Sequence, residues 1–226
     1  GQTFPYISSS TEKKWSIGSN SASYQLNKTI SNFTFDNYGN ITNSKVTISN
    51  HQGGDAQIIE TDFTFPSTWE KERGLARTVD TEKTFGGDTI NTSTDFTYFS
   101  ETSSHPGKVK TKIVNPDSSS KKLTTNYDYD GYGNLDFTSM VGAENSNGSN
   151  TQTRQVSYDY GAEGRYLDSS TDLAGVVTSY LYNGVSGDSV TGPVTKVKST
   201  TNGVSQTVET DLWGRKVKLS ETGKKD

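Results

Sequence analysis

The sequence predicts an all-β protein made of consecutive antiparallel β-hairpins. Three stretches share one short motif: Phe-Asp-Asn-Tyr-Gly-Asn at 35–40, Tyr-Asp-Gly-Tyr-Gly-Asn at 129–134 and Asp-Leu-Trp-Gly-Arg at 211–215. Alternating Thr, Tyr and Val residues flank the motifs, which is typical of strands joined by a short turn. No stretch keeps apolar residues at helical spacing for more than about two turns, so the pattern argues against helices.

The Asp and Gly of the motif explain why it forms a turn. An Asp carboxylate accepts hydrogen bonds from nearby backbone amides, and Gly adopts positive φ without steric cost. We therefore expect hairpin repeats near residues 33–42, 127–137, 158–167 and 209–219. The third copy has Gly161 where the others have Asp, and we expect its turn to be looser.

Between the motifs, alternating sequence predicts further strands at 45–49, 61–65, 95–99, 178–182 and 204–209. Clusters of Asn, Gly, Ser and Asp separate these strands at 50–55, 115–120, 144–150 and 184–188. Residues 69–75 are expected to form one helical turn at most. Glycines near the ends of aromatic strands recur about every 29 residues on average, a spacing typical of repeat proteins.

Composition predicts an ordered protein with shallow packing. Leu, Ile, Val and Phe make up 42 of the 226 residues, but the net charge is only −4, so the chain does not have the composition of a disordered protein. Aromatic residues account for 11% of the chain and are mostly Tyr, which tolerates one wet edge. This favours thin, half-exposed sheets over a deep core.

Other features exclude several classes of site and partner. There is no Cys for disulfides or thiolate metal sites. No stretch of this sequence resembles a signal peptide or is an apolar run of membrane-spanning length, and the mild acidity provides no basic stripe for nucleic acid. The start at Gly1-Gln2-Thr3-Phe4-Pro5 and the charged end at Lys224-Lys225-Asp226 lead us to expect a piece of a larger protein.

The motif resembles the YD repeat of RHS-repeat proteins: Tyr or Phe, Asp, two free residues, Gly, then Asn or Arg. These proteins include the bacterial RHS polymorphic toxins, the B and C components of insecticidal Tc toxin complexes, and the teneurins. Residues 4–12, the first motif, then Thr68-Trp69 and Arg73-Gly74-Leu75 resemble, in that order, the region where an SpvB/TcB-like part passes into the repeats. The resemblance covers most of the chain and favours the bacterial branch.

In that family, hairpins join edge to edge into a curved, spiralling sheet that closes into a shell around a toxin. The resemblance therefore implies that residues 1–226 form a single repetitive wall segment of a secreted toxin cocoon. Its implied partners are neighbouring repeats of the same parent chain and an enclosed cytotoxic cargo. Because an isolated segment would leave strand edges unpaired, we also expect self-association or marginal stability.

The resemblance implies structural rather than catalytic roles for the turn residues. These are Phe35, Asp36, Gly39, Asn40, Tyr129, Asp130, Gly133, Asn134, Tyr160, Gly164, Arg165, Asp211, Gly214 and Arg215. Family members that release their own toxin are expected to carry Asp-Pro motifs at the end of the shell. This chain contains no Asp-Pro dipeptide, so we expect no autoproteolysis from it.

The sequence gives no sign of an active site, metal or cofactor. His51 and His105 each lie in a Gly- or Pro-containing turn without a partner at ligand spacing. Asp128 and Asp130 would share a strand face as a carboxylate pair does, but turn capping already explains Asp130. We therefore expect a protein that is not an enzyme.

The main alternative is a β-repeat surface adhesin or a carbohydrate-binding sheet. Trp15, Trp69 and Trp213, together with the tyrosines, would then form a platform on which sugars stack. That hypothesis predicts exposed, coplanar aromatic rings. The shell hypothesis instead predicts that turn aromatics pack against a neighbouring hairpin.

Overall fold

A computed structural model of the protein describes residues 6–15, 25–50, 54–144, 148 and 150–223. It contains fifteen β-strands, one short α-helix and one 3₁₀ turn within these residues, and the all-β prediction is confirmed. Residues 1–101 with 107–123 form one compact unit, and residues 102–106 with 124–226 form a second. His51 lies outside the described residues, as does the side chain of Trp15.

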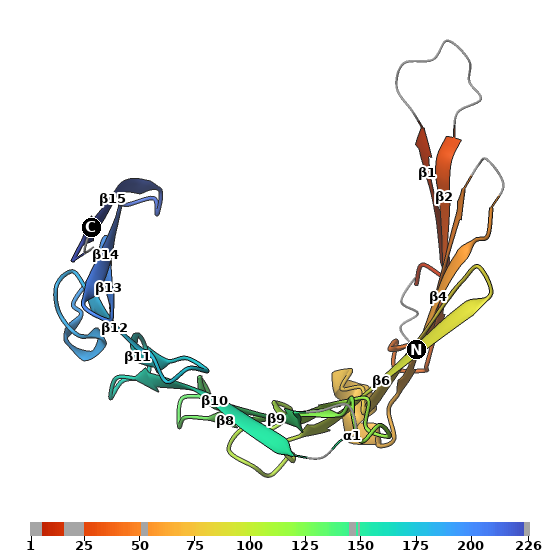
Figure 1. Ribbon diagram of the computed structural model, residues 1–226, viewed down its shortest axis with the longest axis horizontal. Helices are drawn as coiled ribbons and strands as arrows, with labels where there is room; N and C mark the ends of the chain where they lie inside the picture. Colours follow the sequence, from red (N-terminus) through yellow and green to blue (C-terminus); the bar gives the residue numbers. More distant parts are fainter. Residues whose placement is uncertain (1–5, 16–24, 51–53, 145–147, 149, 224–226) are drawn as a thin grey trace. The chain divides into compact units, whose positions relative to one another are not determined.

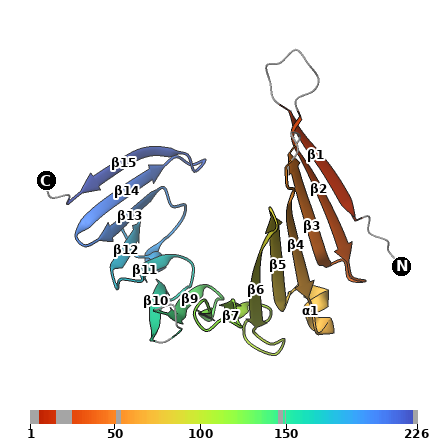
Figure 2. The same ribbon diagram turned by 45° about the vertical axis from the view of Figure 1, so that its right-hand side comes forward.

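The first unit is an antiparallel meander in which each strand pairs with the next one along the chain (Figure 2). Its strands are β1 Ser9–Trp15, β2 Gln25–Phe35, β3 Ile41–Asn50, β4 Gln57–Thr64, β5 Thr78–Phe85, β6 Asp88–Tyr98 and β7 Val109–Val114. The strands expected around 45–49, 61–65 and 95–99 are confirmed in β3, β4 and β6, although β4 ends at Thr64 and β6 at Tyr98.

The second unit repeats this arrangement in strands that again follow chain order. They are β8 Leu123–Tyr129, β9 Leu135–Ala143, β10 Thr151–Tyr160, β11 Leu167–Thr171, β12 Val177–Tyr182, β13 Lys196–Thr201, β14 Val204–Thr210 and β15 Lys216–Thr222. The 3₁₀ turn Gly187–Ser189 lies between β12 and β13. The strands expected at 178–182 and 204–209 are confirmed as parts of β12 and β14.

The helix α1, Thr68–Arg73, is longer than the single turn predicted for this stretch (Figure 1). Ser67 and Glu70 form a capping box, in which the Ser67 hydroxyl accepts from the Glu70 amide and the Glu70 carboxylate accepts from the Ser67 amide. Gly74 ends the helix with φ of 66°. Backbone groups at both ends of the helix therefore find hydrogen-bond partners nearby, which explains how so short a helix is stabilised in a β-protein.

Packing is shallow, as the composition predicts. No hydrophobic side chain among the described residues is fully buried, and the large side chain that is almost completely covered is Glu70. Cross-strand hydroxyl pairs bind neighbouring strands at paired positions, with oxygen distances of 2.6 Å for Thr178–Thr201 and 2.9 Å for Thr200–Ser205. Such pairs stabilise a sheet by packing and hydrogen bonding across strands rather than by a deep apolar core.

Candidate functional site

The Asp turns form a repeated site with one geometry. At Asp36, Asp130 and Asp211, Oδ1 accepts hydrogen bonds from the amides two and four residues later at 2.8–3.0 Å. The Asp amide donates to the carbonyl of the fourth following residue, and the Gly amide donates back to the Asp carbonyl. Each Gly has φ between 78° and 88°, where a side chain would be strained. One carboxylate therefore fixes the whole hairpin turn.

These contacts hold the three carboxylates in their charged form. Partial burial alone would raise the pKa of each, but hydrogen bonds from the turn amides and from the side chain at the fourth following residue outweigh it. The pKa of Asp36, Asp130 and Asp211 is consequently lower than that of an ordinary Asp.

A fourth turn of this class, at Asp172, was not predicted from the sequence. Its Oδ1 accepts from the amides of Ala174 at 2.8 Å and Val176 at 3.0 Å, and Gly175 has φ of 78°. The preceding residue is Thr171 rather than an aromatic, and Val176 stands where the other turns have Asn or Arg. The spacing of Asp and Gly was the signal that could have found it.

The copy at Tyr160, Gly164 and Arg165 lacks the carboxylate, and its turn is longer. The Gly164 amide donates to the Gly161 carbonyl at 2.7 Å, but the Gly161 amide reaches the Tyr166 carbonyl only at 3.4 Å. Strand β11 resumes at Leu167, and the guanidinium of Arg165 lies 5.2 Å from the Tyr166 ring.

The aromatic residues that precede the turns contact other segments of their own unit. Phe35 stacks on Tyr6 with ring centroids 4.6 Å apart, and Tyr129 lies 5.8 Å from the His105 ring. Burial raises the pKa of the Tyr129 hydroxyl. His105 therefore contacts an aromatic ring, and within the described residues no group of three His, Asp or Glu side chains is placed to hold a metal ion.

Two of the turns also contact a segment about 30 residues further along the chain, helix α1 in one case and the turn at Gly164 in the other. Asn40 Nδ2 donates to its own Asp36 at 2.9 Å and to the carbonyl of Lys71 at 2.7 Å. Asn134 Nδ2 likewise donates to Asp130 at 2.9 Å and to the carbonyl of Gly164 at 2.6 Å. Each Asn side chain therefore completes its own turn and links it to a second segment, a pair of contacts here called a clasp.

Glycine makes the second clasp possible. The Tyr132 hydroxyl donates to the Ala162 carbonyl at 2.6 Å, and the body of the Tyr132 side chain lies against Gly164. A Cβ at position 164 would lie 2.2 Å from Tyr132 Cδ2 and 2.8 Å from Tyr132 Cβ. Gly164 is therefore required both for its φ of 62° and for the close approach of the preceding turn.

The Asp211 turn is the last of these turns along the chain, and its Trp213 side chain is exposed. Arg215 Nε donates to Asp211 at 2.7 Å, and its guanidinium lies 5.2 Å from the Trp213 ring. Trp213 is 80% exposed. Arg215 stands in the same turn position as Asn40 and Asn134, but both of these contacts lie within its own turn.

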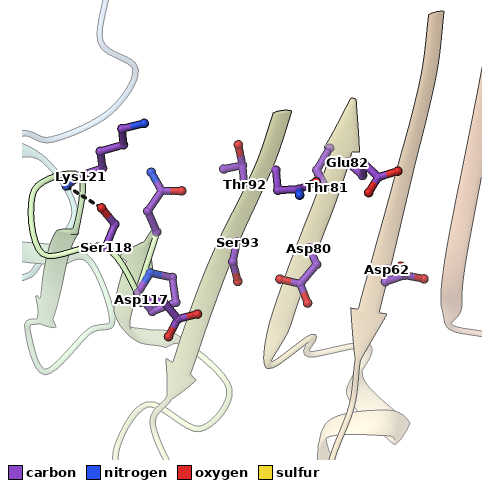
Figure 3. Close-up of a pocket in the computed structure, with 12 residues that line it drawn as sticks. Asp62, Asp80, Thr81, Glu82, Thr92, Ser93, Asp117, Ser118 and Lys121 are labelled. Atoms are coloured by element: carbon purple, nitrogen blue, oxygen red, sulfur yellow. Dashed lines mark hydrogen bonds between the residues drawn. The ribbon is translucent and has the colours of Figure 1, made fainter. Parts of the chain in front are cut away.

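A groove of about 610 Å³ lies in the first unit beside β4, β5 and β6 (Figure 3). Asp62, Asp80 and Glu82 project into it from β4 and β5, and Asp117 follows β7. Asp62 and Asp80 are direct cross-strand partners, although Asp62 accepts a hydrogen bond from Asn43 at 2.7 Å. Like charges at such positions repel, so the groove weakens the sheet locally.

We therefore expect Asp80→Asn to raise the unfolding free energy of the protein by about 0.2–1 kcal/mol. Urea titration at low salt would measure it, and 1 M NaCl should remove most of the gain by screening. Glu82→Gln is a matched control, because the opposite residue Glu60 is already paired with Lys45 at 2.8 Å. An equal gain from both variants would contradict this explanation.

The residues considered for catalysis are engaged in local contacts. Asp130 caps its turn, and Asp128 Oδ1 accepts from the Tyr129 amide at 3.0 Å.

No helix in the described part of the chain is long and apolar enough to cross a membrane.

Comparison with known proteins finds similarity at the level of the fold. No family model matches the sequence, and no curated protein matches it. The crystal structure of TcdB2-TccC3 is similar to this chain, with a TM-score of 0.49 and 12% sequence identity. The match covers 90% of this chain and 11% of the TcdB2-TccC3 chain.

Proposed function

We propose that this chain is a non-catalytic wall segment of a large secreted toxin of the RHS/Tc type, in which YD-repeat hairpins enclose a cytotoxic cargo. The observation that carries the proposal is the clasp by which two of the turns bind a segment about 30 residues further along the chain. Asn40 bonds the Lys71 carbonyl, and Asn134 bonds the Gly164 carbonyl. In repeat proteins, contacts between successive units supply the stability that a single unit lacks.

The absence of fully buried hydrophobic side chains in the described residues supports this role. A free-standing globular domain relies on a core, whereas a wall is stabilised by its neighbours on each side. Strands β1 and β15 stand at the two ends of the strand order. Each is a place where a neighbouring hairpin of the parent chain would pair.

The Asp211 turn suggests how one such neighbour would bind. By analogy with Tyr132 and Asn134, Trp213 would lie against a glycine of the next turn and Arg215 would donate to its backbone carbonyl. The exposure of Leu212, Trp213, Val217 and Leu219, between 62% and 80%, fits a surface made for such a contact. Exposed apolar strands of this kind also favour self-association of the isolated segment.

One observation favours the adhesin alternative, namely the exposed indole of Trp213. Trp69 and Tyr132 are less suited to stacking a sugar. Arg73 lies over the Trp69 ring at 5.1 Å, and the Tyr132 hydroxyl is bonded to Ala162. A coplanar row of free rings is therefore not formed by these residues.

Sequencing the coding frame on both sides of this segment tests the proposal. We expect many further Asp-x-x-Gly hairpins, an Asp-Pro-bearing end to the shell and a variable C-terminal domain. Cell-wall anchoring or carbohydrate-binding modules in their place, together with glycan binding that Trp213→Ala abolishes, would support the adhesin instead.

The clasp itself predicts the effect of Asn134→Ala. This variant loses a bond within its turn and a bond to the Gly164 carbonyl, so we expect it to destabilise the second unit by about 1–3 kcal/mol. Arg215→Ala is the matched control, because it removes only exposed contacts within its own turn, to Asp211 and to the Trp213 ring, and should cost less than Asn134→Ala. Urea denaturation measures both, and equal losses would show that the clasp contributes nothing.

A further inference from the structure

The third turn, residues 161–166, lacks an Asp of its own but is approached by a carboxylate from another segment. The segment between β12 and β13, residues 183–195 and here called the strap, carries Asp188 in its 3₁₀ turn. Asp188 Oδ1 accepts a hydrogen bond from the Glu163 amide at 3.4 Å. Glu163 is two residues after Gly161, and the amide at this position is the one that the turn Asp binds in the other copies.

The Asp188 carboxylate also occupies the space that a side chain at position 161 would need. A Cβ built on Gly161 would lie 2.0 Å from Asp188 Oδ1 and 2.5 Å from Asp188 Cγ. The Asp188 carboxylate therefore lies within reach of the same amide that an Asp at position 161 would bind, and close to the Cβ position of that Asp. Gly161 does not have positive φ, so its backbone conformation does not explain the loss of the Asp.

Hydrogen bonds hold the strap in place on both sides of Asp188. The Gly187 amide donates to Asp168 Oδ1 of β11 at 2.6 Å, and Gly187 has no room for a Cβ beside Asp168 and Tyr166. The hydroxyl of Tyr182, the last residue of β12 before the strap, donates to the Leu167 carbonyl at 2.8 Å. At the base of the strap, Asn183 Oδ1 accepts from the amides of Thr195 and Lys196 at 3.1 Å.

We infer that Asp188 replaces the missing turn Asp, so that the strap caps the third turn from outside the repeat. Gly161 is then the residue that makes space for the incoming carboxylate. The third turn and the strap therefore stabilise each other's conformation. This inference goes beyond the wall function, because it holds whether or not the chain encloses a cargo.

Amide hydrogen exchange of the full chain, followed residue by residue by NMR, tests the inference. Asp188→Ala should speed exchange at the Glu163 amide by about threefold to tenfold, as expected for loss of one hydrogen bond. Asp188→Asn keeps an acceptor oxygen and should retain most of the protection. Ser189→Ala, the neighbouring strap residue, is the control and should leave Glu163 unchanged.

A second-site exchange tests the space argument separately. Gly161→Asp alone should lower the melting temperature, because its carboxylate meets those of Asp188 and Asp168. Adding Asp188→Ala removes the shorter of these contacts and gives the turn its own cap as at Asp130, so it should recover part of the loss, while Asp168 Oδ2 would still lie 2.9 Å from the new Cβ. An unchanged Glu163 amide in Asp188→Ala overturns the inference, and so does a double variant no more stable than Gly161→Asp. If Gly161→Asp does not fold, the hydrogen-exchange data on Asp188→Ala still test whether Asp188 caps the third turn.

Discussion

Replacing Arg77 with leucine is expected to lower the unfolding free energy of the first unit by about 2–4 kcal/mol at neutral pH. Glu70 is only 2% exposed, and Arg77 binds its Oε1 through Nε at 3.0 Å and also through Nη2. Without Arg77, a nearly buried carboxylate keeps only its bonds to Ser67. Because Arg77 itself is about half exposed, water limits the loss to less than that of a fully buried pair.

The loss should depend on pH in a defined direction. Burial alone would raise the pKa of Glu70, but hydrogen bonds from Arg77 and Ser67 outweigh it and hold the pKa below the ordinary Glu value. A lowered folded-state pKa gives stability that is present above the unfolded pKa and is lost as pH falls through the folded pKa. In Arg77→Leu, burial favours the neutral form of Glu70, and protonation removes the unpaired buried charge. The difference in unfolding free energy between this variant and wild type should therefore shrink as the pH falls.

Urea denaturation at neutral pH and below about pH 4 measures both effects, since the unfolded Glu titrates near that value. Glu70→Gln combined with Arg77→Leu removes the charge as well as its partner. This double variant should be more stable than Arg77→Leu at neutral pH and should show no such pH dependence from this site. A loss that stays the same at both pH values would contradict the ion-pair explanation.

Gly164→Ala is expected to destabilise the second unit by about 2–5 kcal/mol, the sum of two costs. Positive φ costs a non-glycine residue about 1–2 kcal/mol, and overpacking against the Tyr132 side chain adds about 1–3 kcal/mol. Tyr132 Cβ is one of the atoms met, so rotation of the ring does not relieve the contact completely.

Gly175→Ala separates the two contributions. Gly175 also has positive φ, at 78°, but a Cβ there meets nothing within 4 Å. This control should therefore show only the conformational cost of about 1–2 kcal/mol. Tyr132→Ala should reduce the cost of Gly164→Ala toward that of Gly175→Ala when each is compared with its own parent. If Gly164→Ala cost the same with and without the Tyr132→Ala substitution, the two turns would not be in contact.

The sequence predicted the fold because strand alternation and turn chemistry are local signals. Asp, Gly and the side chain four residues after Asp lie within one turn, so their spacing is visible in the sequence. Asp172 was missed because Thr171 and Val176 replace the motif's flanking residues while the Asp and Gly remain. The helix was underestimated because its stability comes from the capping box and from Arg77, which follows the helix in the sequence.

The contacts between turns could not be predicted from the sequence. Asn134 reaches the Gly164 carbonyl and Asp188 reaches the third turn only because strands of particular lengths bring those segments together. Neither contact uses a residue type that is unusual at its position. Gly161 showed in the sequence that the third turn departs from the pattern, but the reason lies 27 positions later, at Asp188.

Cryo-electron microscopy of the protein encoded by the complete reading frame tests the wall function most directly. We expect β1 and β15 each to pair with a further hairpin, Trp213 and Arg215 to contact the next turn, and one face of the sheet to border an enclosed chamber. A segment that projects from the surface with β15 unpaired, or that borders no chamber, would contradict the proposed function.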